Sequence, residues 1–229
     1  MATKTVENYE TTIKELYSKF QALPQFHPEY QKLEEQIARQ VSKWADLVNV
    51  VVFAASNESL PWTEAELGLP IRPMHLKSDT GFRQVADYLF QVNDVWGSLA
   101  IERKGVTIKN QRMVGCDLYG TLFNRSNRER FRAELNRFKS DSRLDNFIVL
   151  CECSYGQFLT FSPKFSGNKL SPIDHNGASR QSRIGTIASL ELDGCHVIFA
   201  GTRMMAIELY RAMIRMWVIK HYEIILNIK

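Results

Sequence analysis

One segment constrains the fold more than any other part of the chain. The apolar run Leu99-Ala-Ile101 leads directly into three consecutive charges, Glu102-Arg103-Lys104. Side chains of a strand alternate between its two faces, so Glu102 and Lys104 would share one face and Arg103 would point to the other. The segment therefore predicts a strand that ends in a polar site.

A second strand is predicted just before it, over 87–92. Asn93-Asp94 offers turn chemistry, and the chain would return as a strand over 95–104. In such a hairpin the carboxylate of Asp87 would come near Glu102, although the sequence does not fix the register. Asp94 is the alternative acid, but it falls at the predicted turn. We expect two carboxylates and one ammonium to converge at a strand end.

Strands and helices alternate along the rest of the chain, which predicts an α/β fold with a central mixed sheet flanked by helices. Residues 1–47 are expected to form an N-terminal helical hairpin, and 48–229 the main domain. Within that domain we predict an inserted polar loop at 105–116 and a mobile basic loop at about 162–183. Further elements are expected as strands at 48–53, 147–152 and 196–199, a short helix with loops over 57–80, and helices at 126–140 and 202–221.

Composition restricts the class of protein only loosely. Hydrophobic residues make up 45% of the chain and charged residues 24%, as in folded globular proteins. The net charge of +4 suits a polyanionic partner. With neither an apolar signal core nor a run of about 18 apolar residues, we expect a soluble protein of the cytoplasm, or of the nucleus in a eukaryote, without a membrane partner. The four scattered cysteines are expected to be buried free thiols, and no glycine-rich loop for ATP is present.

Arginines lie just before the predicted helix at 126–140 and in its first turns. Arg125, Arg128 and Arg132 follow the spacing i, i+3, i+7 and would share one helix face. The apolar residues of the same helix form a neighbouring stripe, so the arginine row could face a phosphate backbone. The alternative is a solvated face on which glutamates of the same helix pair with the arginines.

The acidic pair and the lysine are the groups that phosphodiester hydrolysis needs. Asp87 and Glu102 would hold Mg²⁺ or Mn²⁺ through hard oxygen ligands. The metal would lower the pKa of a bound water and neutralise charge on the phosphate. Lys104 would orient that water or stabilise the transition state.

These motifs together resemble the nuclease domain of the XPF/MUS family of structure-specific endonucleases, within the restriction-endonuclease-like PD-(D/E)xK superfamily. The resemblance spans about residues 48–220. It rests on four segments in order: Ala86-Asp-Tyr-Leu89, Ile101-Glu-Arg-Lys104, Asp117-Leu-Tyr-Gly-Thr-Leu122 and Asn127-Arg-Glu-Arg-Phe131.

The resemblance implies roles for single residues. Asp87 and Glu102 would be metal ligands and Lys104 the catalytic lysine, with Arg103 and Asp117 supporting the site. The family's second aspartate follows the lysine after three residues, where this chain has Ile108, and Asp117 stands thirteen positions after Lys104. The family's acid near the end of the first strand has Glu58 as its candidate here.

The sequence thus predicts a magnesium-dependent DNA endonuclease acting on branched, flapped or nicked DNA, in DNA repair or recombination. Homodimerisation, common in the family, is possible by the same analogy. Two alternatives remain open. One is a catalytically inactive nuclease fold that binds DNA, and the other is a restriction or repair nuclease that recognises duplex DNA.

Overall fold

The computed structural model describes residues 5–24, 26–56, 58, 60–74, 85–161 and 178–228. The chain forms two compact units. One comprises residues 1–51, 90–97 and 211–229, and the other comprises 52–89 and 98–210. Both ends of the sequence therefore contribute to the first unit, while the predicted site residues at 87, 102–104 and 117 all belong to the second. The domain boundary expected at residue 47 stays a prediction.

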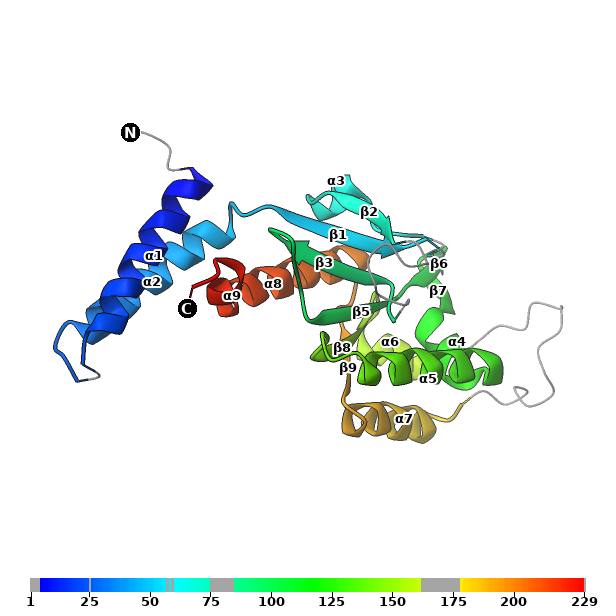
Figure 1. The fold of residues 1–229 in the computed structure, drawn as a ribbon. Coiled ribbons are helices and arrows are strands. Elements are labelled where there is room, and N and C mark those ends of the chain that lie inside the picture. The colour runs from blue at the N-terminus through cyan, green and yellow to red at the C-terminus, as the bar shows by residue number, and fades with distance from the viewer. Residues whose placement is uncertain are drawn as a thin grey trace. The chain divides into compact units, whose positions relative to one another are not determined.

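The centre of the fold is a mixed β-sheet (Figure 1), which confirms the predicted fold class. The strand order is β2-β1-β3-β5-β8-β9, with β4 paired to β3. The pairs β1–β2, β5–β8 and β8–β9 are parallel, and β3 is antiparallel to both β4 and β5. The strands are β1 Val50–Ala55, β2 Ile71–Met74, β3 Tyr88–Val92, β4 Val95–Trp96, β5 Leu99–Lys104, β8 Asn146–Cys151 and β9 Cys195–Phe199.

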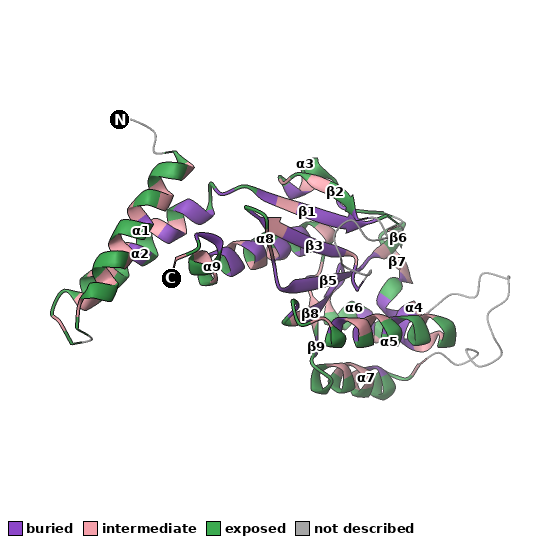
Figure 2. Ribbon diagram, viewed as in Figure 1, coloured by how far each residue is buried: buried purple, intermediate pink, exposed green. Residues whose placement is uncertain are grey.

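The interior strands of this sheet are buried along almost their whole length, as Figure 2 shows for β5 and β8. All six residues of β5 are buried, including the three charged ones at its end. Burying charges is costly unless they are paired. The end of β5 is therefore the place where the fold needs a specific set of partners.

Helices accompany the sheet in the second unit, among them α5, Arg125–Ser140. Its buried Phe131 and Phe138 pack edge-on against Phe147 of β8, with ring centroids 5.9 and 5.3 Å away. The predicted apolar stripe thus anchors this helix on the sheet. The other helices of the unit are α3 Glu64–Leu67, α4 Asp117–Phe123, α6 Tyr155–Thr160, α7 Arg180–Leu192 and the start of α8 Arg203–Lys220.

The first unit contains the predicted helical hairpin, α1 Val6–Ala22 and α2 Tyr30–Ala45, together with the short helix α9, Tyr222–Ile225. Trp44 is fully buried and its Nε1 donates to Glu10 Oε1 at 3.1 Å, which joins α2 to α1. The ring of Tyr17 lies 6.2 Å from that of Tyr222. This unit is held together by packing between the two ends of the sequence.

The predicted loop at 105–116 was wrong, because this segment folds as a β-hairpin. Its strands are β6, Val106–Lys109, and β7, Arg112–Cys116. Asn110 and Gln111 form the turn with φ of 49° and 60°, the conformation that two-residue hairpins require and that Asn tolerates. The polar composition hid the alternation of Val106 and Ile108 with polar neighbours.

Two other expectations need correction. Strand β2 lies in a region predicted as short helix and loop, and it carries Pro73, which is compatible with its place at the sheet edge. Residues 180–183, assigned to the basic loop, are the first turn of α7, where Ser179 accepts the N–H of Ser182 as the N-cap. Of the rest of that predicted loop, residues 162–177 lie outside the described residues.

Candidate active site

The β3–β5 pairing brings the two predicted acids to one face of the sheet. Tyr88 pairs with Ile101 in antiparallel register, and continuing that register by one residue sets Asp87 opposite Glu102. Two backbone bonds fix Asp87: its carbonyl accepts the N–H of Ala55 at 2.8 Å, and its Oδ2 accepts the N–H of Arg103 at 2.8 Å. The convergence that the sequence left open is therefore set by strand register.

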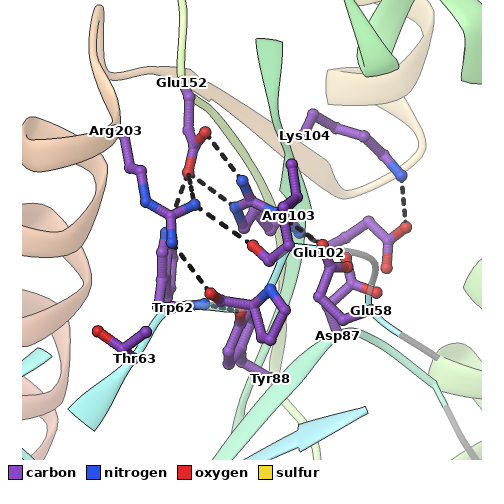
Figure 3. Close-up of polar contacts among 12 residues, drawn as sticks. Glu58, Trp62, Thr63, Asp87, Tyr88, Glu102, Arg103, Lys104, Glu152 and Arg203 are labelled. Atoms are coloured by element: carbon purple, nitrogen blue, oxygen red, sulfur yellow. Dashed lines mark hydrogen bonds and ion pairs between the residues drawn. The ribbon is translucent and has the colours of Figure 1, made fainter. Parts of the chain in front are cut away.

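Lys104 lies on the same face and contacts Glu102 directly. Its Nζ donates to Glu102 Oε1 at 2.6 Å, and both residues are buried, with 6% and 4% of their surface exposed. In Figure 3 the lysine side chain extends away from Arg103 toward the carboxylate of Glu102. The alternation predicted for Glu102-Arg103-Lys104 is the alternation observed.

The electrostatics of this face are dominated by crowded negative charge. Burial raises the pKa of Asp87 well above its ordinary value, the neighbouring Glu102 raises it further, and Lys104 opposes both only in part. Burial alone would lower the pKa of Lys104, but Glu102 and Asp87 outweigh it, so its pKa is raised. The lysine is thus a persistent cation beside carboxylates that repel one another.

A further carboxylate, that of Glu134 from α5, acts electrostatically on this face and was not predicted as a site residue. Burial and the charge of Glu102 raise its pKa, and it in turn raises the pKa of Lys104. It lies one turn after Phe131, whose ring centroid is 6.0 Å from Lys104 Nζ. The sequence contained an indication of this position, because Glu134 is an acidic residue next to the apolar stripe of α5, between Phe131 and Phe138.

The donor set of this face fits a hard divalent cation. Mg²⁺ is held by one or two carboxylates, with water and substrate oxygens completing its shell, and Asp87 and Glu102 supply two. Burial and then the charge of Glu102 raise the pKa of Asp87, and a cation bound between the two carboxylates would oppose both effects. No group of three or more His, Cys, Asp or Glu in the part of the chain that the structure describes is arranged as a ready metal cage.

Arg103 points to the opposite face and is surrounded by carboxylates (Figure 3). Its Nε and NH2 donate to Glu152 at 2.7 and 3.0 Å, and its NH1 donates to Glu58 at 2.6 Å. Glu152 also accepts from Trp62 Nε1 at 3.0 Å and lies 3.5 Å from Arg203 NH1. This bidentate, buried pairing is typical of a structural network.

The three acids whose participation was open lie in different places. Glu58 joins the Arg103 network. Asp117 is brought back by the β6–β7 hairpin, since its N–H donates to the Gly105 carbonyl at 3.1 Å, and Lys104 and Arg103 oppose the rise that burial causes in its pKa. Asp94 is in the β3–β4 turn, with φ of 66°, at the other end of β3 from Asp87.

The predicted arginine row lies on the exposed surface of α5. Arg125, Arg128 and Arg132 are all exposed. Arg125 Nε contacts Glu129 at 3.1 Å, a pairing of the kind that the alternative reading expected. The four cysteines are buried and free, as predicted. Within the described ranges, no helix is both long and apolar enough to cross a bilayer.

Comparison with known proteins adds little to this geometry. No protein-family model matches the chain, and no curated protein does. Among solved structures the chain is similar to XPF from Aeropyrum pernix, with 14% sequence identity and a TM-score of 0.44, over 76% of this chain and 68% of that chain. A similarity at this level assigns neither an activity nor a residue role to the chain.

Proposed function

We propose that the protein is a metal-dependent endonuclease that hydrolyses phosphodiester bonds in DNA, with branched, flapped or nicked DNA as the substrate. The observation that carries this proposal is the shared face of Asp87, Glu102 and Lys104 at the end of β5. Two acids that repel each other beside a buried ammonium favour a site that takes up a cation and a phosphate together.

In this mechanism each side chain has a separate task. Asp87 and Glu102 would hold Mg²⁺ or Mn²⁺, and the metal would supply a bound water of lowered pKa and neutralise charge on the phosphate. Lys104 donates hydrogen bonds to the reacting phosphate or to the attacking water. To do so it would have to give up part of its 2.6 Å contact with Glu102, whose carboxylate would then be available as a metal ligand.

Arg103 and Asp117 support the site without touching the reacting phosphate. The backbone N–H of Arg103 holds Asp87 Oδ2 while its guanidinium neutralises Glu152 and Glu58, so Arg103 fixes one ligand by its backbone and the strand end by its side chain. The Asp117 carboxylate lies within the field of Lys104. Removal of either would disturb the position of the ligands.

The exposed arginine row of α5 is the proposed contact with DNA. The same helix carries Glu134 beside Lys104, which links the row to the site through one rigid element. Replacing Arg125, Arg128 and Arg132 by Gln should weaken binding to all DNA sequences alike. Each lost phosphate contact should reduce the slope of log K against log salt by about 0.9.

The decisive experiment compares Glu102→Gln with Glu208→Gln, a matched change at an exposed glutamate of α8. Labelled fork, nicked and linear duplex DNA are incubated with Mg²⁺, with Mn²⁺ and with EDTA. Wild type and Glu208→Gln should cleave only with metal, and Glu102→Gln should be slower by about 10²-fold or more. Equal cleavage by Glu102→Gln would exclude the proposed site, and preference for linear duplex would favour a restriction or repair nuclease.

Metal binding is measured separately from cleavage. A cation held by Asp87 and Glu102 should raise the melting temperature, with about 2.7 kcal/mol of stabilisation at a metal concentration one hundred times Kd. Glu102→Gln should abolish the rise and Glu208→Gln should keep it. The absence of any rise in the wild type would remove the metal from the proposal.

A second candidate is a nuclease fold that binds DNA without cleaving it. The close contact of Lys104 with Glu102 favours it, because this contact occupies one carboxylate oxygen that a metal would need. Such a protein would bind forks with a strong salt dependence but cleave none of them with any divalent cation.

A further inference from the structure

A cavity of about 790 Å³ opens on the Arg103 face, away from the two acids of the proposed metal site. Its size is in the range of sites that enclose small organic ligands. Arg103, Glu152, Arg203 and Thr63 form part of its lining, and Figure 3 shows the side chains of Arg103, Glu152 and Arg203 near one another. None of the roles proposed above uses this space.

The walls of the cavity are largely apolar, and their large apolar side chains come from two separate segments. Val106, Ile108 and Met113 of the β6–β7 hairpin supply one side, and Leu60 and Pro61 supply another. Leu60 and Ile108 are 67% and 60% exposed, which is unfavourable for large apolar side chains unless something covers them. The walls thus suit a ligand with apolar faces.

The polar part of the lining carries no net charge. Arg103 is bonded to Glu152, and Arg203 to Glu66, at 2.7 Å in each case. An isolated phosphate would have to compete with these carboxylates for the guanidinium groups. A flat uncharged ring with hydrogen-bonding edges would find donors and acceptors without breaking either pair, and a nucleobase has this chemistry.

The position of the cavity relates it to the proposed active site. Arg103 lines the cavity, and its two neighbours in β5, Glu102 and Lys104, form the other face. A DNA strand whose phosphate lies at Lys104 could place the base of a nearby nucleotide across the end of β5. A base inside a duplex could not reach this space without leaving its stack.

We propose that this cavity accepts an unpaired nucleobase of the DNA substrate and so directs the enzyme to single-stranded branches or ends. This inference rests on the proposed DNA-binding function. It explains why the enzyme would prefer branched DNA to an intact duplex. The hairpin that supplies Ile108 and Met113 lies between Lys104 and Asp117. The same segment therefore forms one wall of the cavity and brings Asp117 back to Gly105, beside the proposed active site.

The test is a scan with abasic nucleotides. Fork DNAs are made with one abasic analogue at each of the first six positions of the single-stranded arm, and Kd is measured by fluorescence anisotropy in EDTA. One or two positions should weaken binding by about fivefold or more, as for the loss of one stacked base. In the variant Ile108→Ala/Met113→Ala this position-specific loss should nearly vanish, because the wall is gone.

Leu192→Ala is the matched control, since Leu192 is 89% exposed and lies on α7. It should keep the position-specific loss. A second measurement on the wild type places 2-aminopurine at the sensitive position, where fluorescence should change on binding more than at neighbouring positions. Weakening that is equal at all six positions, or unchanged in the double variant, would overturn the cavity proposal alone. Failure to bind any fork would overturn the proposed function itself.

Discussion

The two faces at the end of β5 handle buried charge in opposite ways. On the Arg103 face, each carboxylate accepts a hydrogen bond from a guanidinium: Glu58 and Glu152 from Arg103, and Glu66 from Arg203. On the other face the single ammonium of Lys104 faces both Asp87 and Glu102, while the more distant Glu134 pairs with Arg130 at 3.7 Å. Adjacent residues of β5 therefore belong to two different charge arrangements. On the Arg103 face each of these carboxylates is paired with a guanidinium, whereas on the Lys104 face the described carboxylates outnumber the described cations.

The pKa values record this difference. The Arg203 hydrogen bond lowers the pKa of Glu66 to about 2. Burial and a neighbouring carboxylate instead raise the pKa of Asp87 and of Glu134. Matched charges stabilise a fold, whereas unmatched ones persist where a ligand completes them. The ion pairs of the Arg103 face therefore stabilise the fold, whereas the proposed hydrolysis uses the Lys104 face.

The largest effect is expected when the ion pairs of the Arg103 face are removed. Arg103→Ala leaves Glu152 and Glu58 without their main cation and should reduce the free energy of unfolding by about 3–5 kcal/mol. Urea denaturation measures the loss. Arg125→Ala, which removes an exposed pair, is the control and should cost at most about 1 kcal/mol. A loss as small in Arg103→Ala would show that the network is not structural.

The next effect concerns the crowded face. Lys104→Met removes the cation at the reacting phosphate and should slow single-turnover cleavage by about 10²–10³-fold, while fork binding changes little. Lys43→Met, at an exposed position of α2, should cleave as the wild type does. If Lys104→Met kept full activity, Lys104 would have only a structural role as the partner of Glu102.

A smaller effect is expected for Glu134, which we class as a positioning residue. Because its carboxylate raises the pKa of Lys104, Glu134→Gln should move the alkaline limb of the cleavage profile to lower pH, by less than about one unit. Glu129→Gln is the control on the exposed side of the same helix. A profile that does not move would separate Glu134 from the site.

The smallest expected effect tests the ion pair between Glu66 and Arg203 on the Arg103 face. Glu66 has its folded pKa lowered to about 2 from an ordinary 4.5, so its ion pair contributes stability above pH 4.5 that is lost as pH falls through 2. Arg203→Ala should remove this pH-dependent part, about 1 kcal/mol or less for a partly exposed pair. Unfolding measured between pH 2 and 5 should show a flatter acid limb in the variant. An unchanged limb would contradict the pairing.

Part of this arrangement could be predicted because it depends on neighbours in the sequence. Alternation along a strand separates Glu102 and Lys104 from Arg103, and the helical spacing of Phe131, Leu135 and Phe138 indicates the buried face of α5. The turn residues at 93–94 also predicted the antiparallel return, although the single strand expected over 95–104 is divided into β4 and β5. The mixed α/β class followed from the same local patterns.

Tertiary structure decided the rest. Strand register set Asp87 opposite Glu102, the unpredicted hairpin returned Asp117 to Gly105, and helix packing brought Glu134 to Lys104. Local sequence fixes the direction of a side chain relative to its own backbone. Which distant groups contact that side chain depends on how whole helices and strands pack against one another. The free energy of this packing is spread over the entire core.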